Sequence, residues 1–281
     1  MPDQPMDNTR APHTCDIGDV RFGGGALAMI AGPCVAESLD LCLEVASRLS
    51  EICRRLGVGY VFKASFDKAN RSSVDGFRGP GLKTGLDWLA QVKEKFSVPV
   101  LSDVHDIAQV APAAEVLDCL QIPAFLCRQT DLIVAAALTD KAVNVKKGQF
   151  MAPWDMEQAV RKVRSAGNVN VLLTERGTSF GYNRLVTDLC GIPVMRRYAP
   201  VVFDATHSVM EPGALGNASG GKGQYAPLLA GAAMAAGADA LFVETHPQPS
   251  HAKSDAAVMV PLADMETMLA RCLAIFKIGK F

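Results

Sequence analysis

The stretch from Lys63 to Ser73 combines cations with short polar side chains in a pattern suited to holding an anion. Lys63, Lys68 and Arg71 supply positive charge, and serine and asparagine side chains between and beside them supply directional donors. A tetrahedral phosphate has acceptor oxygens on every side and therefore needs both. Solvated loops after strands have similar composition, so this stretch alone leaves phosphate binding and an ordinary loop both open.

Other residues able to do chemistry recur at the same kind of position, just after short apolar runs. In chain order the clusters are Cys34 and Glu37; Lys63 to Ser73; Asp103 and His105; Gln121 and Arg128; Lys146 and Lys147; Glu175 and Arg176; Asp204 and His207; and Glu244 and His246. Strand ends are often polar, but the repetition indicates one site built from many loops. The repeated Lys and Arg predict a pocket that binds more than one anionic group.

The elements that must position these residues alternate between strand and helix along the chain. The runs that predict strands are Leu27–Ala31, Tyr60–Phe62, Val98–Leu101, Cys119–Ile122, Ala142–Val145, Val169–Leu173, Val201–Phe203 and Ala240–Val243. Their continuous apolar character is typical of strands buried on both faces. Helical spacing is found in Leu39–Leu56, Thr84–Phe96, Ile107–Val116, Leu132–Leu138, Trp154–Ala166, Tyr182–Met195, Ala226–Ala236 and Pro261–Phe276.

This alternation predicts the α/β class and a single (β/α)8 TIM barrel over residues 26–281. A doubly wound open sheet is the competing architecture. Residues 13–25, with Gly18 at a turn, predict a short hairpin that caps the N-terminal end of the barrel, and the first dozen residues are expected to be loose. Residues 1–25 are thus a flexible N-terminus with a capping hairpin. The carboxyl ends of barrel strands meet on one face, where we expect the polar clusters to converge.

Composition excludes several classes of function. The chain has 281 residues, a net charge of -1 and 6% aromatic residues, which argues against a protein that binds nucleic acid or membrane surfaces through bulk charge. We expect a cytoplasmic protein, because no N-terminal or internal apolar run resembles a signal or a membrane span. Eight cysteines without C-x-x-C pairs suggest buried thiols in a reducing compartment.

A second set of residues near the same strand ends has side chains that could bind a metal ion. In a closed barrel the eighth strand neighbours the first, so Cys34, His207, Glu244 and Asp255 could converge. A thiolate, an imidazole and two carboxylates suit Zn²⁺, Fe²⁺, Co²⁺ or Mn²⁺ rather than Mg²⁺ or Ca²⁺. The ordinary alternative is that Cys34 is a small buried hydrophobe.

Long motifs in one order give the chain a family resemblance from about residue 20 onward. They span residues 31–38, 62–73, 121–132, 144–150, 203–208 and 244–247. The sequence resembles the 3-deoxy-D-manno-octulosonate 8-phosphate synthases. The resemblance implies condensation of phosphoenolpyruvate with D-arabinose 5-phosphate for lipopolysaccharide biosynthesis, in a homotetramer.

The resemblance also implies roles for individual residues. Phosphoenolpyruvate would be surrounded by Lys63, Lys68, Lys146 and Arg176, with Gln121 to Ala124 lining the same pocket. The sugar phosphate would be bound by Asn70, Arg71 and Ser72, with Arg128 reaching across a subunit boundary and Asp103 and His105 near the sugar chain. Lys68, His207 and Asp255 are candidates for proton transfer.

Cys34 is the position at which this family divides, since the resemblance implies Cys in metal-dependent members and Asn in metal-independent ones. Lys253 to Ala257 also resembles the metal-dependent branch. The implied cofactor is a divalent ion held by Cys34, His207, Glu244 and Asp255.

Two alternatives remain at this point. The related 3-deoxy-D-arabino-heptulosonate 7-phosphate synthases use erythrose 4-phosphate and carry Lys-Pro-Arg-Thr-Ser where this chain has Lys68-Ala-Asn-Arg-Ser-Ser73, so Ala69 and Asn70 favour the pentose phosphate. A non-catalytic sugar-phosphate-binding barrel would have no use for metal-type ligands beside a phosphate site.

Overall fold

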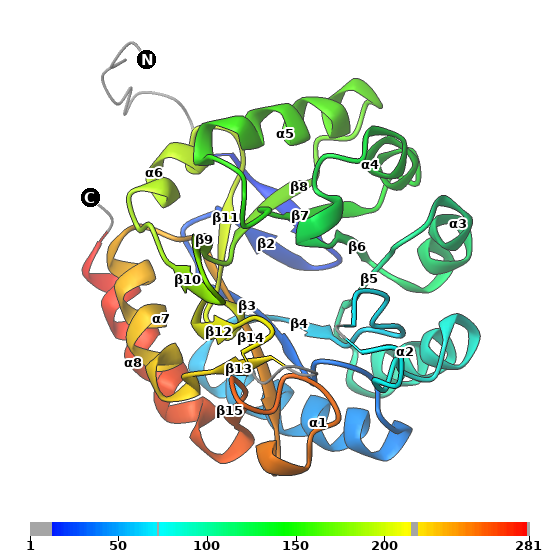
Figure 1. Ribbon diagram of the computed structural model, residues 1–281, viewed down its shortest axis with the longest axis vertical. Coiled ribbons are helices and arrows are strands. Elements are labelled where there is room, and N and C mark those ends of the chain that lie inside the picture. Colours follow the sequence, from blue (N-terminus) through cyan, green and yellow to red (C-terminus); the bar gives the residue numbers. More distant parts are fainter. Residues whose placement is uncertain (1–12, 72, 215–218, 280–281) are drawn as a thin grey trace.

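The computed structural model describes residues 13–71, 73–214 and 219–279, and its centre is a closed ring of eight parallel strands (Figure 1). In ring order the strands are β3 (Ala28–Gly32), β4 (Gly59–Lys63), β5 (Val100–Asp103), β6 (Cys119–Ile122), β7 (Ala142–Lys146), β8 (Val171–Glu175), β11 (Val201–Asp204) and β14 (Ala240–His246). β14 pairs with both β11 and β3, which closes the ring. The predicted single (β/α)8 barrel is therefore confirmed.

Helices surround the ring (Figure 1). They are α1 (Leu39–Leu56), α2 (Leu82–Phe96), α3 (Ile107–Val116), α4 (Thr130–Ala137), α5 (Met156–Ser165), α6 (Gly191–Arg196), α7 (Ala226–Ala235) and α8 (Met265–Ile278). Local chemistry sets the ends of α1: the Ser38 hydroxyl accepts a hydrogen bond from the Leu41 amide at 3.1 Å, and Gly57 terminates the helix with φ of +68°. Within the described residues, none of the helices is both long and apolar enough to cross a membrane.

A short antiparallel hairpin, β1 (Cys15–Ile17) and β2 (Val20–Phe22), precedes the barrel. Gly18 occupies its turn with φ of +57°. Ile17 and Phe22 are fully buried in one cluster with inward-facing barrel residues such as Leu101 and Phe242. The hairpin thus continues the barrel interior at the N-terminal ends of the strands. The first twelve residues, expected to be loose, lie outside the described residues.

The predicted helix Tyr182–Met195 is wrong over most of its length. Residues up to 186 instead form a hairpin of β9 (Thr178–Gly181) and β10 (Arg184–Val186), and only Gly191–Arg196 is helical. Tyr182 and Asn183 adopt positive φ values of 46° and 64°, a turn conformation that Asn tolerates well. Turn chemistry therefore outweighs the apolar spacing that suggested a helix.

Most of the predicted strands end later than their apolar runs indicate. They extend to polar residues that the sequence places in the following loops, so that the strands include Lys63, Asp103, Lys146, Asp204 and Glu244. Charged residues inside a strand are tolerated here because they pair with one another across the barrel. The remaining short strands are β12 (Met210–Glu211), β13 (Gly220–Gly221) and β15 (Val260–Pro261). Because Pro261 lies in β15, α8 begins at Met265 and not at the predicted Pro261.

Candidate active site

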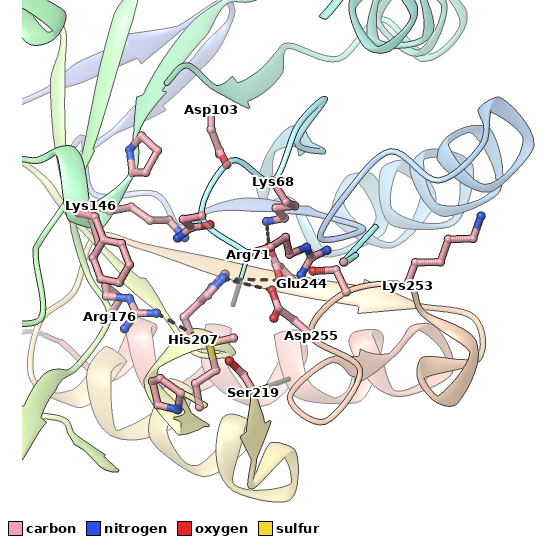
Figure 2. Close-up of a pocket in the computed structure, with 18 of the residues that line it drawn as sticks. Lys68, Arg71, Asp103, Lys146, Arg176, His207, Ser219, Glu244, Lys253 and Asp255 are labelled. Carbon is pink, nitrogen blue, oxygen red and sulfur yellow. Dashed lines mark hydrogen bonds and ion pairs between the residues drawn. The ribbon is translucent and has the colours of Figure 1, made fainter. Parts of the chain in front are cut away.

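A cavity of about 480 Å³ opens at the C-terminal ends of the barrel strands. It gathers nearly all the side chains that the sequence singled out (Figure 2). The predicted site residues that line it are Lys63, Lys68, Asn70, Arg71, Asp103, His105, Gln121, Ala124, Lys146, Arg176, His207, Glu244 and Asp255. Cys34 is fully buried against this group, whereas Ser72 lies outside the described residues. Arg128 is exposed and is not among the residues lining its own cavity.

Three of the four predicted metal ligands form a compact group. Cys34, Glu244 and Asp255 each offer one ligand atom within 4.8 Å of the others. Cys34 Sγ lies 2.9 Å from Asp255 Oδ2 and 2.9 Å from Ser254 Oγ. Asp255 holds φ of +52°, an uncommon conformation for a residue other than glycine, in the loop after β14.

His207 borders this group rather than completing it. Its Nε2 atom is 3.8 Å from Glu244 Oε2 and 4.0 Å from Asp255 Oδ2. Its Nδ1 atom is 2.7 Å from Asp204 Oδ2, an ion-pair contact that does not have the geometry of a hydrogen bond. A carboxylate at Nδ1 favours the tautomer that keeps the proton there, which leaves the Nε2 lone pair facing the carboxylates. This is the usual support for a metal-binding histidine.

The group has the properties that a divalent cation requires. Glu244 Oε2 is buried and has no hydrogen-bond partner among the described residues, which is costly unless something positive contacts it. Burial, then the charges of Asp255 and Glu244, raise the pKa of the Cys34 thiol well above its usual value. A bound cation reverses that effect, because it stabilises the thiolate. The donor set fits Zn²⁺, Fe²⁺, Co²⁺ or Mn²⁺.

Three buried lysines lie between the carboxylates and the rest of the cavity. Lys63 Nζ donates to Glu244 Oε1 and to the Cys34 carbonyl, both at 2.7 Å. Lys146 Nζ donates to Asp204 Oδ2 at 2.6 Å and lies 3.7 Å from the centre of the Phe242 ring. Lys68 Nζ is 4.0 Å from Glu244 Oε1.

Lys68 and Lys146 have pKa values shifted in opposite directions. Burial lowers the pKa of Lys146, and the attraction of Asp204 only partly offsets it. Burial also acts to lower the pKa of Lys68, but the negative groups around it, Cys34 and Glu244 foremost, raise it well above its usual value. Lys68 is thus the more firmly protonated of the two.

Two arginines present donors that nothing in the described protein uses. Arg71 Nη2 and Arg176 Nη1 are both buried and lack a hydrogen-bond partner among the described residues. Arg71 follows β4 and Arg176 follows β8, so they enter the cavity from different sides (Figure 2). Since an unpaired buried guanidinium is unfavourable, the cavity is built to take up anionic groups at two separate places.

Some supporting residues were not assigned roles from the sequence. Asp204 contacts both Lys146 and His207, and its position at the end of a predicted strand was the only signal. Lys147 and Glu175 form a fully buried pair, with Nζ 3.5 Å from Oε2. Glu175 Oε1 accepts from the amides of Arg176 and Gly177, so this pair fixes the backbone that carries Arg176.

The chain is similar to known proteins over most of its length. The family model described as DAHP synthetase I family matches residues 4–276. The chain is 58% identical over 261 residues to the 2-dehydro-3-deoxyphosphooctonate aldolase of Trichlorobacter lovleyi, covering 92% of this chain and 96% of that protein. It is 57% identical to the protein of the same name from Geobacter sp. (strain M21) over the same shares. It is 56% identical to that of Cyanothece sp. (strain PCC 7425) over 92% of this chain and 95% of the relative.

Proposed function

The chain belongs to the DAHP synthetase I family, and we propose that it condenses phosphoenolpyruvate with D-arabinose 5-phosphate and water. The products are 3-deoxy-D-manno-octulosonate 8-phosphate and phosphate, and the reaction belongs to lipopolysaccharide biosynthesis. The names of the relatives support this choice within the family. The observation that carries it concerns two buried guanidinium nitrogens, Arg71 Nη2 and Arg176 Nη1, on separate sides of one cavity; neither has a hydrogen-bond partner among the described residues. Two phosphorylated reactants need two such places.

Phosphoenolpyruvate occupies the part of the cavity bordered by Arg176 and Lys146. Its carboxylate and phosphate are acceptors on every side, and Lys63, Lys68 and Arg176 offer charge-assisted donors from the lining of the cavity. The same cations bind the departing phosphate. Gln121 and Ala124 line the wall beside them.

Arabinose 5-phosphate occupies the part near the loop after β4. Asn70, Arg71 and Ser72 bind its phosphate, and Asp103 and His105 face its hydroxyl groups. Arg128, which is exposed and not among the residues lining its own cavity, serves the sugar phosphate of a neighbouring copy in a homotetramer.

Cys34, His207, Glu244 and Asp255 would hold a divalent Zn, Fe, Mn or Co ion. When bound, the ion would supply a positive centre able to polarise an oxygen of the aldehyde or of water. Two observations favour this assignment: Glu244 Oε2 is buried without a hydrogen-bond partner in the described part of the chain, and Asp204 lies 2.7 Å from His207 Nδ1.

The reaction depends mainly on alignment. Carbon 3 of phosphoenolpyruvate forms a bond to the aldehyde carbon, water adds at carbon 2, and the resulting intermediate expels phosphate by carbon–oxygen cleavage. Lys63 and Lys146 act as charged groups rather than as Schiff-base amines, because each donates to a carboxylate at 2.7 Å or less. Lys68, His207 and Asp255 are the candidates for carrying protons to and from the reacting oxygens.

All eight cysteines are free and seven of them are buried, which is typical of a reducing compartment and supports a cytoplasmic location.

Phosphate release measured with arabinose 5-phosphate and with erythrose 4-phosphate tests the proposal. We expect a higher kcat/KM with the pentose phosphate, since Ala69 and Asn70 lengthen the segment before Arg71 relative to the heptulosonate synthases. A higher kcat/KM with erythrose 4-phosphate would assign the chain to that other reaction.

A further inference from the structure

A continuous chain of hydrogen bonds runs inside the barrel across four neighbouring strands and ends on Asp103. Thr174 Oγ1 bonds to Asn144 Oδ1 at 2.7 Å, and Asn144 Nδ2 bonds to Gln121 Oε1 at 2.9 Å. Gln121 Nε2 bonds to Asp103 Oδ1, while Ser65 Oγ bonds to Asp103 Oδ2 at 2.9 Å. All five residues are at most 7% exposed.

The direction of every bond in this chain follows from its charged end. An ionised carboxylate only accepts, so Asp103 requires the amide nitrogen of Gln121 on its side. Gln121 must then turn its oxygen toward Asn144, which requires the Asn144 nitrogen there and leaves the Asn144 oxygen for Thr174. Thr174 can only donate to that oxygen. The amide orientations are therefore fixed by chemistry as well as by distance.

The two ends of this chain of hydrogen bonds differ in their access to the cavity. Asn144 and Thr174 are 0% exposed, behind the wall, whereas Gln121 and Asp103 border the cavity. The second hydrogen on Gln121 Nε2 has no acceptor among the residues that the structure describes. Asp103 accepts two bonds from the protein and keeps acceptor capacity on the cavity side.

We propose that Asn144 and Thr174 are positioning residues that make Gln121 present an N–H donor, and Asp103 an acceptor, to the two substrates. This inference rests on the proposed function, in which Gln121 borders phosphoenolpyruvate and Asp103 borders the sugar. The anionic oxygens of phosphoenolpyruvate accept hydrogen bonds and match the N–H. The sugar hydroxyls donate and match the carboxylate. Were the Gln121 amide reversed, its oxygen would face an anion on one side and a carboxylate on the other.

Two nearly isosteric variants test the chain from its buried end. Thr174→Val removes the terminal donor and should reduce kcat/KM for phosphoenolpyruvate, and its binding constant in calorimetry, by about tenfold, as expected for one buried hydrogen bond. Asn144→Asp cannot donate to Gln121 Oε1 when ionised, and should have a larger effect because it favours the reversed amide. Thr174→Ser retains the hydroxyl and should stay within about threefold of the unmodified protein.

Thr139→Val is the matched control. Thr139 Oγ1 donates to the Ala136 carbonyl, also at 2.7 Å, just after α4 and away from the cavity. This variant should lose thermal stability without any loss in phosphoenolpyruvate binding. The contrast separates positioning from general destabilisation.

The outcomes are distinct. The positioning role is overturned if the folded Thr174→Val and Asn144→Asp proteins bind phosphoenolpyruvate as tightly as the unmodified protein does. If Thr174→Val does not fold, the result with Asn144→Asp decides alone. If the unmodified protein binds phosphoenolpyruvate but does not condense it with arabinose 5-phosphate, the proposed function is wrong, and the binding constants of the same variants still decide the positioning role. Absence of phosphoenolpyruvate binding would overturn both.

Discussion

Replacing Arg71 with alanine is expected to weaken use of the sugar phosphate selectively. Arg71 Nε donates to the Phe77 carbonyl at 2.9 Å, which fixes the side chain, while Nη2 is buried without a partner in the described protein. In the proposed function Nη2 contacts the sugar phosphate, and such a contact would be charge-assisted at a buried atom. A contact of this kind is worth about 1.5–3 kcal/mol, which corresponds to about 10- to 150-fold in affinity.

The assay is initial-rate phosphate release with each substrate varied at saturation of the other. Arg71→Ala should raise KM for arabinose 5-phosphate by that factor and change KM for phosphoenolpyruvate by less than about threefold. Arg78→Ala is the matched control, because Arg78 follows on the same loop but pairs with Asp67 at the surface. A defect directed mainly at phosphoenolpyruvate, or one no larger than that of Arg78→Ala, would refute the assignment of Arg71 to the sugar phosphate.

Three further outcomes are expected. Prolonged chelation should abolish activity, and Mn²⁺, Co²⁺, Fe²⁺ or Zn²⁺ should restore it. Without metal, the Cys34→Asn variant should keep some activity and the Cys34→Ala variant none. Full activity of the metal-free unmodified protein would contradict the metal site. Sedimentation should show a tetramer, and an active monomer would remove the proposed role of Arg128. Burial alone would raise the pKa of Asp103, but Lys63 and Lys68 hold this pKa well below its usual value. The ionised Asp103 carboxylate therefore stabilises the folded protein above about pH 4, and this contribution is lost as the pH falls further. In thermal melts Asp103→Asn should therefore cost stability near neutral pH and progressively less below about pH 4, and a constant difference would count against this coupling.

The fold could be predicted well from the sequence because a strand buried on both faces is a short, continuous apolar run. It placed their ends too early, since Lys63 or Glu244 looks like a loop residue until its partner 2.7 Å away is known. The same limit applies to the site. Position after a strand was enough to bring Arg176 and His207 into one cavity, but not to find Asp204 between Lys146 and His207, because that pairing is a matter of distance across the barrel.

The closure of the ring between β3 and β14 has a consequence for how the protein matures. Cys34 and Asp255 touch although 221 positions separate them along the chain, so their meeting point does not exist until the last strand has joined the first. A nascent chain still lacking β14 has no such point, and contacts this distant form slowly. A cation bound there, as proposed, would link β3 to the loop after β14, and it would stabilise only the closed ring. Stripping the cation should therefore speed amide hydrogen exchange first along β3 and β14, while the opposite wall at β6 and β7 stays protected.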